Sequence, residues 1–161
     1  LVRIARALED RIEALSGEAW RRTMAINLDA NLSLLRECHP LLKLAPRGGR
    51  VAVIGSKNLP APGPGAAAYS ASKAALLNLT QSLAKELAGS GITVNAVAPG
   101  ITQTDIISEV PQEMIDGMVA QTPLGRIGRS EDIARAVVFL ASDDASWITG
   151  QVLQSSGGLM L

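Results

Sequence analysis

Three short apolar runs, separated by long helical patterns, constrain the fold of this chain most strongly. The runs cover residues 51–54, 92–98 and 151–154, and helical patterns over 67–88 and 130–141 lie between them. Strands that alternate with helices usually pair in parallel through right-handed crossovers. The sequence therefore predicts an α/β fold in which the three strands form one parallel sheet.

The N-terminal third of the chain has helical periodicity. We expect an amphipathic helix over 4–15 and a second helix over 18–44, which Pro40 should kink or bring to the end of its regular part. Within residues 102–122, Pro111 and Gly117 break any regular pattern, so short helices are expected there. Ser130 is a plausible N-cap for the last helix.

Composition limits the classes of partner. The 161 residues are 47% hydrophobic, which is enough for one sizeable core, and 15 basic side chains balance 15 acidic ones. We therefore expect neither a nucleic acid nor a membrane partner. The single Cys38 cannot form an internal disulfide, which suits a reducing cytoplasm. Cys38 and His39 are neighbours on a helix without further ligands, so no metal site is predicted.

One cluster of residue types can move a proton onto or off a carbonyl oxygen. The only tyrosine, Tyr69, precedes Lys73 by four residues in a predicted helix, and Ser56 closes the first strand. Residues four apart share a helix face, and a nearby cation favours the phenolate, which makes Tyr69 a candidate general acid or base. Taken alone, the Tyr–Lys pair favours a structural reading, because any exposed helix could carry it.

The neighbours of this pair change that balance. Between about residues 20 and 158, seven motifs resemble the short-chain dehydrogenase/reductase family in order and in spacing. They are Asn27 within 26–28, Ile54-Gly-Ser56, Tyr69-Ser-Ala-Ser-Lys73, the strand and turn 91–100, Pro99-Gly-Ile-Thr-Gln-Thr104, the pair 123–128 and 130–134, and Ile148-Thr-Gly150.

The resemblance implies a role for each matching residue. Tyr69 would be the catalytic acid/base, Lys73 would hold the nicotinamide ribose, Ser56 would bind and polarise the substrate oxygen, and Asn27 would complete a proton relay through water. The segment that would contact the nicotinamide carboxamide is Pro99, Gly100, Ile101 and Thr104, with Ile101 acting through its backbone and Thr104 through its hydroxyl. The implied cofactor is NAD or NADP, and the implied substrate is a small alcohol or carbonyl compound.

The first half of a dinucleotide-binding fold has no match in this chain. No glycine-rich turn opens a helix directly after a strand, although such a turn normally receives the pyrophosphate. We therefore expect residues 1–161 to be one partial domain, the C-terminal part of a doubly wound Rossmann-type parallel sheet without its N-terminal half. Residues 102–128 would form a substrate lid. By resemblance, helices 18–44 and 67–88 would form the interface of a homodimer or homotetramer.

Several alternatives stay open at this point. The chain could be an inactive dehydrogenase-like module that acts as an assembly partner, or a 3-ketoacyl-thioester reductase. A weaker likeness, over about twenty residues, points to the dehydrogenase half of bifunctional sugar-phosphate aldolase/alcohol dehydrogenases. A Ser-His hydrolase is disfavoured because no Gly-x-Ser-x-Gly elbow is present. Arg126 and Asp132 fit a local ion pair better than a substrate clamp, and Asn95 fits a structural role.

Overall fold

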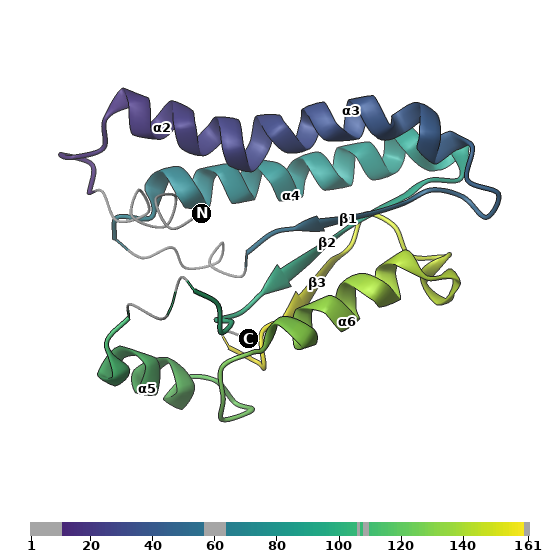
Figure 1. The fold of residues 1–161 in the computed structure, drawn as a ribbon. Helices are drawn as coiled ribbons and strands as arrows, with labels where there is room; N and C mark the ends of the chain where they lie inside the picture. The colour runs from purple at the N-terminus through teal and green to yellow at the C-terminus, as the bar shows by residue number, and fades with distance from the viewer. Residues whose placement is uncertain (1–10, 57–63, 106, 108–109, 160–161) are drawn as a thin grey trace.

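The computed structural model contains a three-stranded parallel sheet in the order β1-β2-β3, with helices on both faces (Figure 1). Strand β1 covers Arg50–Ile54, β2 covers Thr93–Pro99 and β3 covers Val152–Ser155. The predicted parallel α/β arrangement is therefore confirmed. The structure describes residues 11–56, 64–105, 107 and 110–159.

The two faces of the sheet bury different side chains, because successive residues of a strand point to opposite sides. On one face, Val53 and Ala96, which are partners in the register of β1 and β2, pack with Leu76 of helix α4 (Ala67–Leu87). On the other face, Val97 packs with Leu140 of helix α6 (Ser130–Ala141). Figure 1 shows α4 above the sheet and α6 below it.

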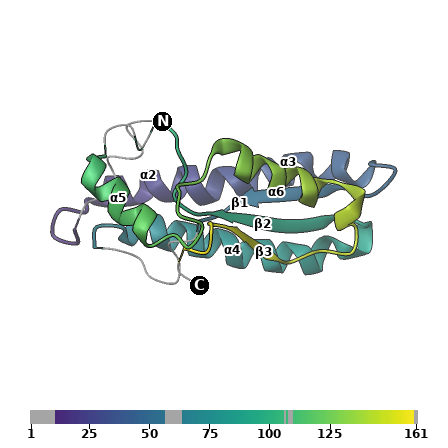
Figure 2. The same ribbon diagram turned by 90° about the horizontal axis from the view of Figure 1, so that it is seen from below.

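The long N-terminal helix changes its hydrogen-bond pattern part-way along. Helix α2 (Gly17–Met24) passes into a π-helical turn over Ala25–Asp29 before helix α3 (Ala30–Lys43). The predicted helix over 18–44 is therefore confirmed in extent, whereas the π turn inside it was not predicted, because a π turn leaves no composition signal. Pro40 lies inside α3, which ends three residues later. Figure 2 shows helices α2 and α3 from below.

The start of α6 also differs from its prediction. Arg129, not Ser130, occupies the N-cap position, and the Asp132 carboxylate accepts a hydrogen bond from the Arg129 backbone N–H at 2.8 Å. The lid segment contains helix α5 (Gln112–Ala120), as the expectation of short helices suggests. Residues 4–10 of the first predicted helix lie outside the described part of the chain, and within that part no helix has the length and apolarity to cross a membrane.

Asn95 connects the sheet to the segment that leads into β3. This fully buried side chain donates to the Ile148 carbonyl at 2.8 Å and accepts from the Gln151 N–H at 3.0 Å. Both contacts are to backbone, so the structural role predicted for Asn95 is confirmed. They hold β3 beside β2, which brings the carboxyl ends of all three strands to the same edge.

The outer edge of β1 has no strand partner among the described residues. In the sheet β1 pairs with β2 alone, and the Ile54 side chain at its end is 44% exposed. An apolar strand edge of this kind is normally covered in a complete domain. A doubly wound sheet would continue on this side.

Candidate active site

The carboxyl ends of β1 and β2 open into a cavity of about 800 Å³. This is where ligands bind in open α/β sheets. Three groups of candidate residues meet in its wall. They are Ser56 from the end of β1, Tyr69 and Lys73 from α4, and Pro99, Gly100, Ile101 and Thr104 from the segment after β2.

Tyr69 and Lys73 lie on the same side of the first turns of α4. The Lys73 ammonium nitrogen is 5.9 Å from the centroid of the Tyr69 ring and donates a hydrogen bond to the Ile54 carbonyl at 2.9 Å. The bond joins α4 to the end of β1. Burial of the side chain lowers the pKa of Lys73, which is one of the residues that line the cavity. The site thus holds a cation beside the phenol.

Ser56 reaches the cavity because Gly55 lets the chain pass close to α4. A Cβ atom at Gly55 would lie 2.7 Å from Cδ2 of Leu77, so a larger residue would require the Leu77 side chain to move. The Gly55 N–H donates to the Val97 carbonyl at 2.8 Å, which extends the sheet pairing by one residue. The buried Ser56 is therefore held on a short, fixed connection.

The segment after β2 is held by backbone contacts. The Gly100 N–H donates to the Ser155 carbonyl at 2.9 Å, and the Thr102 hydroxyl donates to the Gly100 carbonyl at 3.1 Å. A Cβ atom at Gly100 would lie 2.7 Å from the Ser156 Cα, so only glycine permits this approach. These contacts present Ile101 and Thr104 to the cavity.

Asn27 takes a different place from the other predicted residues. It does not line the cavity; its side-chain amide donates to the Ser72 hydroxyl at 3.0 Å, and that hydroxyl donates to the Tyr69 carbonyl at 2.7 Å. Sequence reasoning missed Ser72, a fully buried residue. Its position between Tyr69 and Lys73 was the available signal. The relay role of Asn27 remains a prediction.

The cavity fits one end of a dinucleotide. An ammonium and hydroxyl groups suit the hydroxyls of a ribose and the carboxamide of a nicotinamide, and Lys73, Thr104 and the backbone near Ile101 supply groups of these kinds. Within the described ranges, no glycine-rich turn joins a strand to a helix, so the pyrophosphate end has no corresponding cradle there. The residues therefore fit the nicotinamide riboside part of the cofactor.

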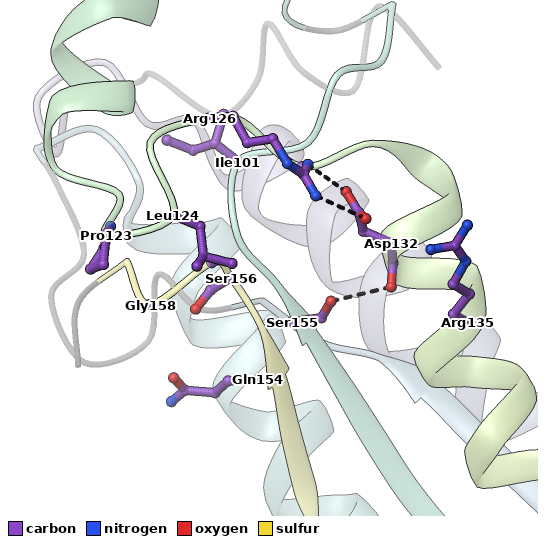
Figure 3. Close-up of a pocket in the computed structure, with 12 residues that line it drawn as sticks. Ile101, Pro123, Leu124, Arg126, Asp132, Arg135, Gln154, Ser155, Ser156 and Gly158 are labelled. Carbon is purple, nitrogen blue, oxygen red and sulfur yellow. Dashed lines mark hydrogen bonds and ion pairs between the residues drawn. The ribbon is translucent and has the colours of Figure 1, made fainter.

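A second cavity of about 560 Å³ lies beside the end of β3 (Figure 3). Its wall holds Arg126, whose two terminal nitrogens donate to the two carboxylate oxygens of Asp132 at 2.7 and 3.1 Å. Figure 3 shows these side chains pointing toward one another. The prediction of a local ion pair is confirmed. This cavity contains neither Tyr69 nor Lys73, so we assign the candidate chemistry to the larger one.

Comparisons with known proteins agree with this geometry. The family model described as enoyl-(acyl carrier protein) reductase matches residues 2–160. The chain belongs to the short-chain dehydrogenase/reductase family. Members of this family are NAD(P)-dependent oxidoreductases, and the fold described above is the C-terminal part of the family's doubly wound sheet.

Individual relatives are similar over most of this short-chain dehydrogenase/reductase chain. The 3-oxoacyl-[acyl-carrier-protein] reductase FabG of Rickettsia felis is 42% identical over 147 residues, which cover 91% of this chain and 61% of the relative. The solved 3-oxoacyl-[acyl-carrier protein] reductase of Brucella melitensis has a TM-score of 0.90 at 29% identity, covering 96% of this chain and 58% of that protein.

A second solved structure carries a ligand. It is named as a putative NAD(P)-dependent gluconate 5-dehydrogenase from Beutenbergia cavernae with bound NADP at low occupancy, and it has a TM-score of 0.89 at 38% identity. The match covers 94% of this chain and 61% of the Beutenbergia cavernae protein. The chain thus spans about three-fifths of the length of the relatives it matches.

Proposed function

We propose that the whole protein is an NAD(P)-dependent oxidoreductase that interconverts a secondary alcohol and a ketone. The observation that carries this proposal is that Ser56, Tyr69 and Lys73 line one cavity at the carboxyl ends of the strands. The family and the NADP-bound neighbour support NAD or NADP as the cofactor. When bound, the nicotinamide supplies or accepts the hydride.

The residues of this chain handle the proton and the substrate oxygen. In the reducing direction, the Ser56 hydroxyl would hold the carbonyl oxygen while the Tyr69 phenol donates a proton to it. The Lys73 ammonium, fixed by the Ile54 carbonyl, would favour the phenolate that remains and hold the ribose hydroxyls. Asn27 would connect the site to water for return of the proton.

The substrate side of the cavity is mostly apolar. Ile107 and Met118 of the lid segment face it together with Ile133 and Val137 of α6. Residues 102–122 contain no basic side chain, and Arg126 is already paired with Asp132. These features favour a neutral, partly apolar substrate over a strongly anionic one.

A second candidate substrate class is a 3-oxoacyl thioester. Its support is the name of several relatives that are 39–44% identical to this chain, including FabG of Escherichia coli. Both classes place a ketone oxygen between Ser56 and Tyr69. Steady-state assays with NAD(P)H and either acetoacetyl-CoA or a neutral ketone such as cyclohexanone separate the two.

The inferred partner besides the substrate is a second copy of the protein. Helix α3 carries large apolar side chains that are well exposed, with Leu34 at 64% and Leu41 at 70%. This supports a homodimer or homotetramer through the predicted interface helices 18–44 and 67–88.

Replacement of Tyr69 by Phe tests the proposed reaction. In the natural polypeptide, Tyr69→Phe should lower kcat by about 10²–10⁴-fold, because it removes the proton donor and keeps the ring. Nicotinamide absorbance measures turnover, and equilibrium dialysis with NAD(H) or NADP(H) checks that the cofactor still binds. Ser56→Ala should also lower kcat, whereas Ser90→Ala, at an exposed serine beyond α4, is the matched control.

Undiminished turnover in Tyr69→Phe would refute the proposal. A wild-type protein that binds the cofactor but turns over neither test substrate, and that assembles with itself, would favour the inactive-module alternative instead.

A further inference from the structure

A hydrogen-bonded network outside the cavity joins helix α3 to the first turns of α4. The Asn31 side-chain amide donates to the Asn27 carbonyl at 2.9 Å. The Asn27 side-chain amide donates in turn to Ser72, which donates to the Tyr69 carbonyl. Figure 1 shows the segment of α2 and α3 running alongside α4, and the bond that crosses to α4 comes from Asn27 in the turn between them.

The π turn decides which way Asn27 points. Within it, the Ala30 N–H donates to the Ala25 carbonyl, five residues back instead of four. One extra residue in a helix rotates everything beyond it by about 100°. A return to regular α-helical register in this turn would therefore move the Asn27 amide off the Ser72 hydroxyl.

A π turn requires stabilising contacts, because it is less favourable than the α-helix around it and occurs mainly as single turns. Asn31 supplies such a contact. A carbonyl oxygen has two lone pairs, so the Asn27 carbonyl can accept from this side chain as well as from the backbone. Asn31 is half-buried at the start of α3, one turn beyond Asn27.

We propose that Asn31 is a positioning residue of the active site. Its hydrogen bond to the Asn27 carbonyl holds the π turn in the register that directs the Asn27 amide to Ser72. Through Ser72 it fixes the turn of α4 that carries Tyr69 and Lys73. This inference rests on the proposed function, because a positioning role has meaning only for a working site.

A matched pair of substitutions isolates the hydrogen bond. Asn31→Ser keeps a donor that can reach the carbonyl four residues back, as Thr80 does to Leu76 at 2.9 Å and Thr122 does to Met118 at 2.8 Å. Asn31→Ala differs from it by one hydroxyl and has no donor. Alanine is also the better helix former, so its general effect on a helix is stabilising.

The first readout does not depend on activity. In the natural polypeptide, we expect Asn31→Ala to speed amide hydrogen exchange at least about tenfold in residues 24–32 and in the first turn of α4, since the π turn is released. Asn31→Ser should exchange like the wild type. Asn78→Ala, at an exposed asparagine of α4, is the control for loss of an asparagine.

The second readout is kinetic. Asn31→Ala should lower kcat by about 10- to 100-fold while KM changes by less than about twofold, because a small misplacement affects the reaction more than binding. Wild-type exchange and kcat in Asn31→Ala would overturn the proposal, and so would an Asn31→Ser variant as impaired as Asn31→Ala. If Tyr69→Phe remained active, the proposed function would fail, whereas the exchange data would still decide whether Asn31 holds the π turn.

Discussion

Lys73 combines two contacts that bear on both stability and chemistry. Its ammonium donates to the Ile54 carbonyl, and it lies 5.9 Å from the Tyr69 ring centroid. Burial lowers the pKa of this lysine, so folding carries a cost for keeping it charged. The site accepts this cost to hold a cation next to the phenol.

The lowered pKa makes a prediction about stability against pH. Between the folded-state pKa and the ordinary value of 10.5, the unfolded chain binds the Lys73 proton more strongly than the folded chain does. The contribution of Lys73 to the free energy of unfolding therefore rises with pH through this window. Lys73→Met removes that rise, which urea unfolding of both proteins at a series of pH values measures. A wild-type minus Lys73→Met difference that does not change with pH contradicts the prediction.

At the scale of elements, the ends of β2 and β3 depend on a close backbone contact. Gly100 approaches Ser156 so closely that a Cβ atom would lie 2.7 Å from the Ser156 Cα. The same two segments are joined by the bond from the Gly100 N–H to the Ser155 carbonyl. The position of Ile101 and Thr104 in the cavity wall follows from this contact.

A pair of glycine substitutions tests this contact. Gly100→Ala should lower the free energy of unfolding by about 1–3 kcal/mol, because the added methyl group must displace backbone. Gly117→Ala is the matched control: it lies within α5, and an added Cβ would meet nothing within 4 Å. It should raise stability by about 0.5–1 kcal/mol, as alanine does within helices. Equal effects of the two substitutions in urea unfolding would contradict the role given to Gly100.

The helix and strand positions followed from local patterns, but finer features did not. Apolar runs placed all three strands to within two residues, because burial on both faces requires such runs. The π turn over Ala25–Asp29 and the cap at Arg129 depend on contacts from other elements or from side chains downstream. For the same reason, the sequence could suggest Asn27 but could not show that its amide is joined to the Tyr69 carbonyl through Ser72.

At the scale of the whole molecule, the candidate site lies at one edge of the sheet. The candidate residues meet at the strand ends, and β1 leaves an edge without a strand partner among the described residues. The chain spans about three-fifths of the length of its relatives. That residues 1–161 contain no glycine-rich turn after a strand was apparent from the sequence, because the spacing of such a turn is fixed. The shape of the cavity could not be predicted from the sequence, because it depends on how residues 102–128 pack against α6.

The central claim is that the Tyr69 phenol and the Ser56 hydroxyl act on one substrate oxygen beside Lys73. A crystal structure of the natural polypeptide with a nicotinamide cofactor and a ketone inhibitor tests it most directly. We expect both hydroxyl oxygens within hydrogen-bonding distance of the inhibitor oxygen, and the Lys73 ammonium on the ribose. An inhibitor bound in the cavity with its oxygen in contact with neither Tyr69 nor Ser56 would contradict the claim.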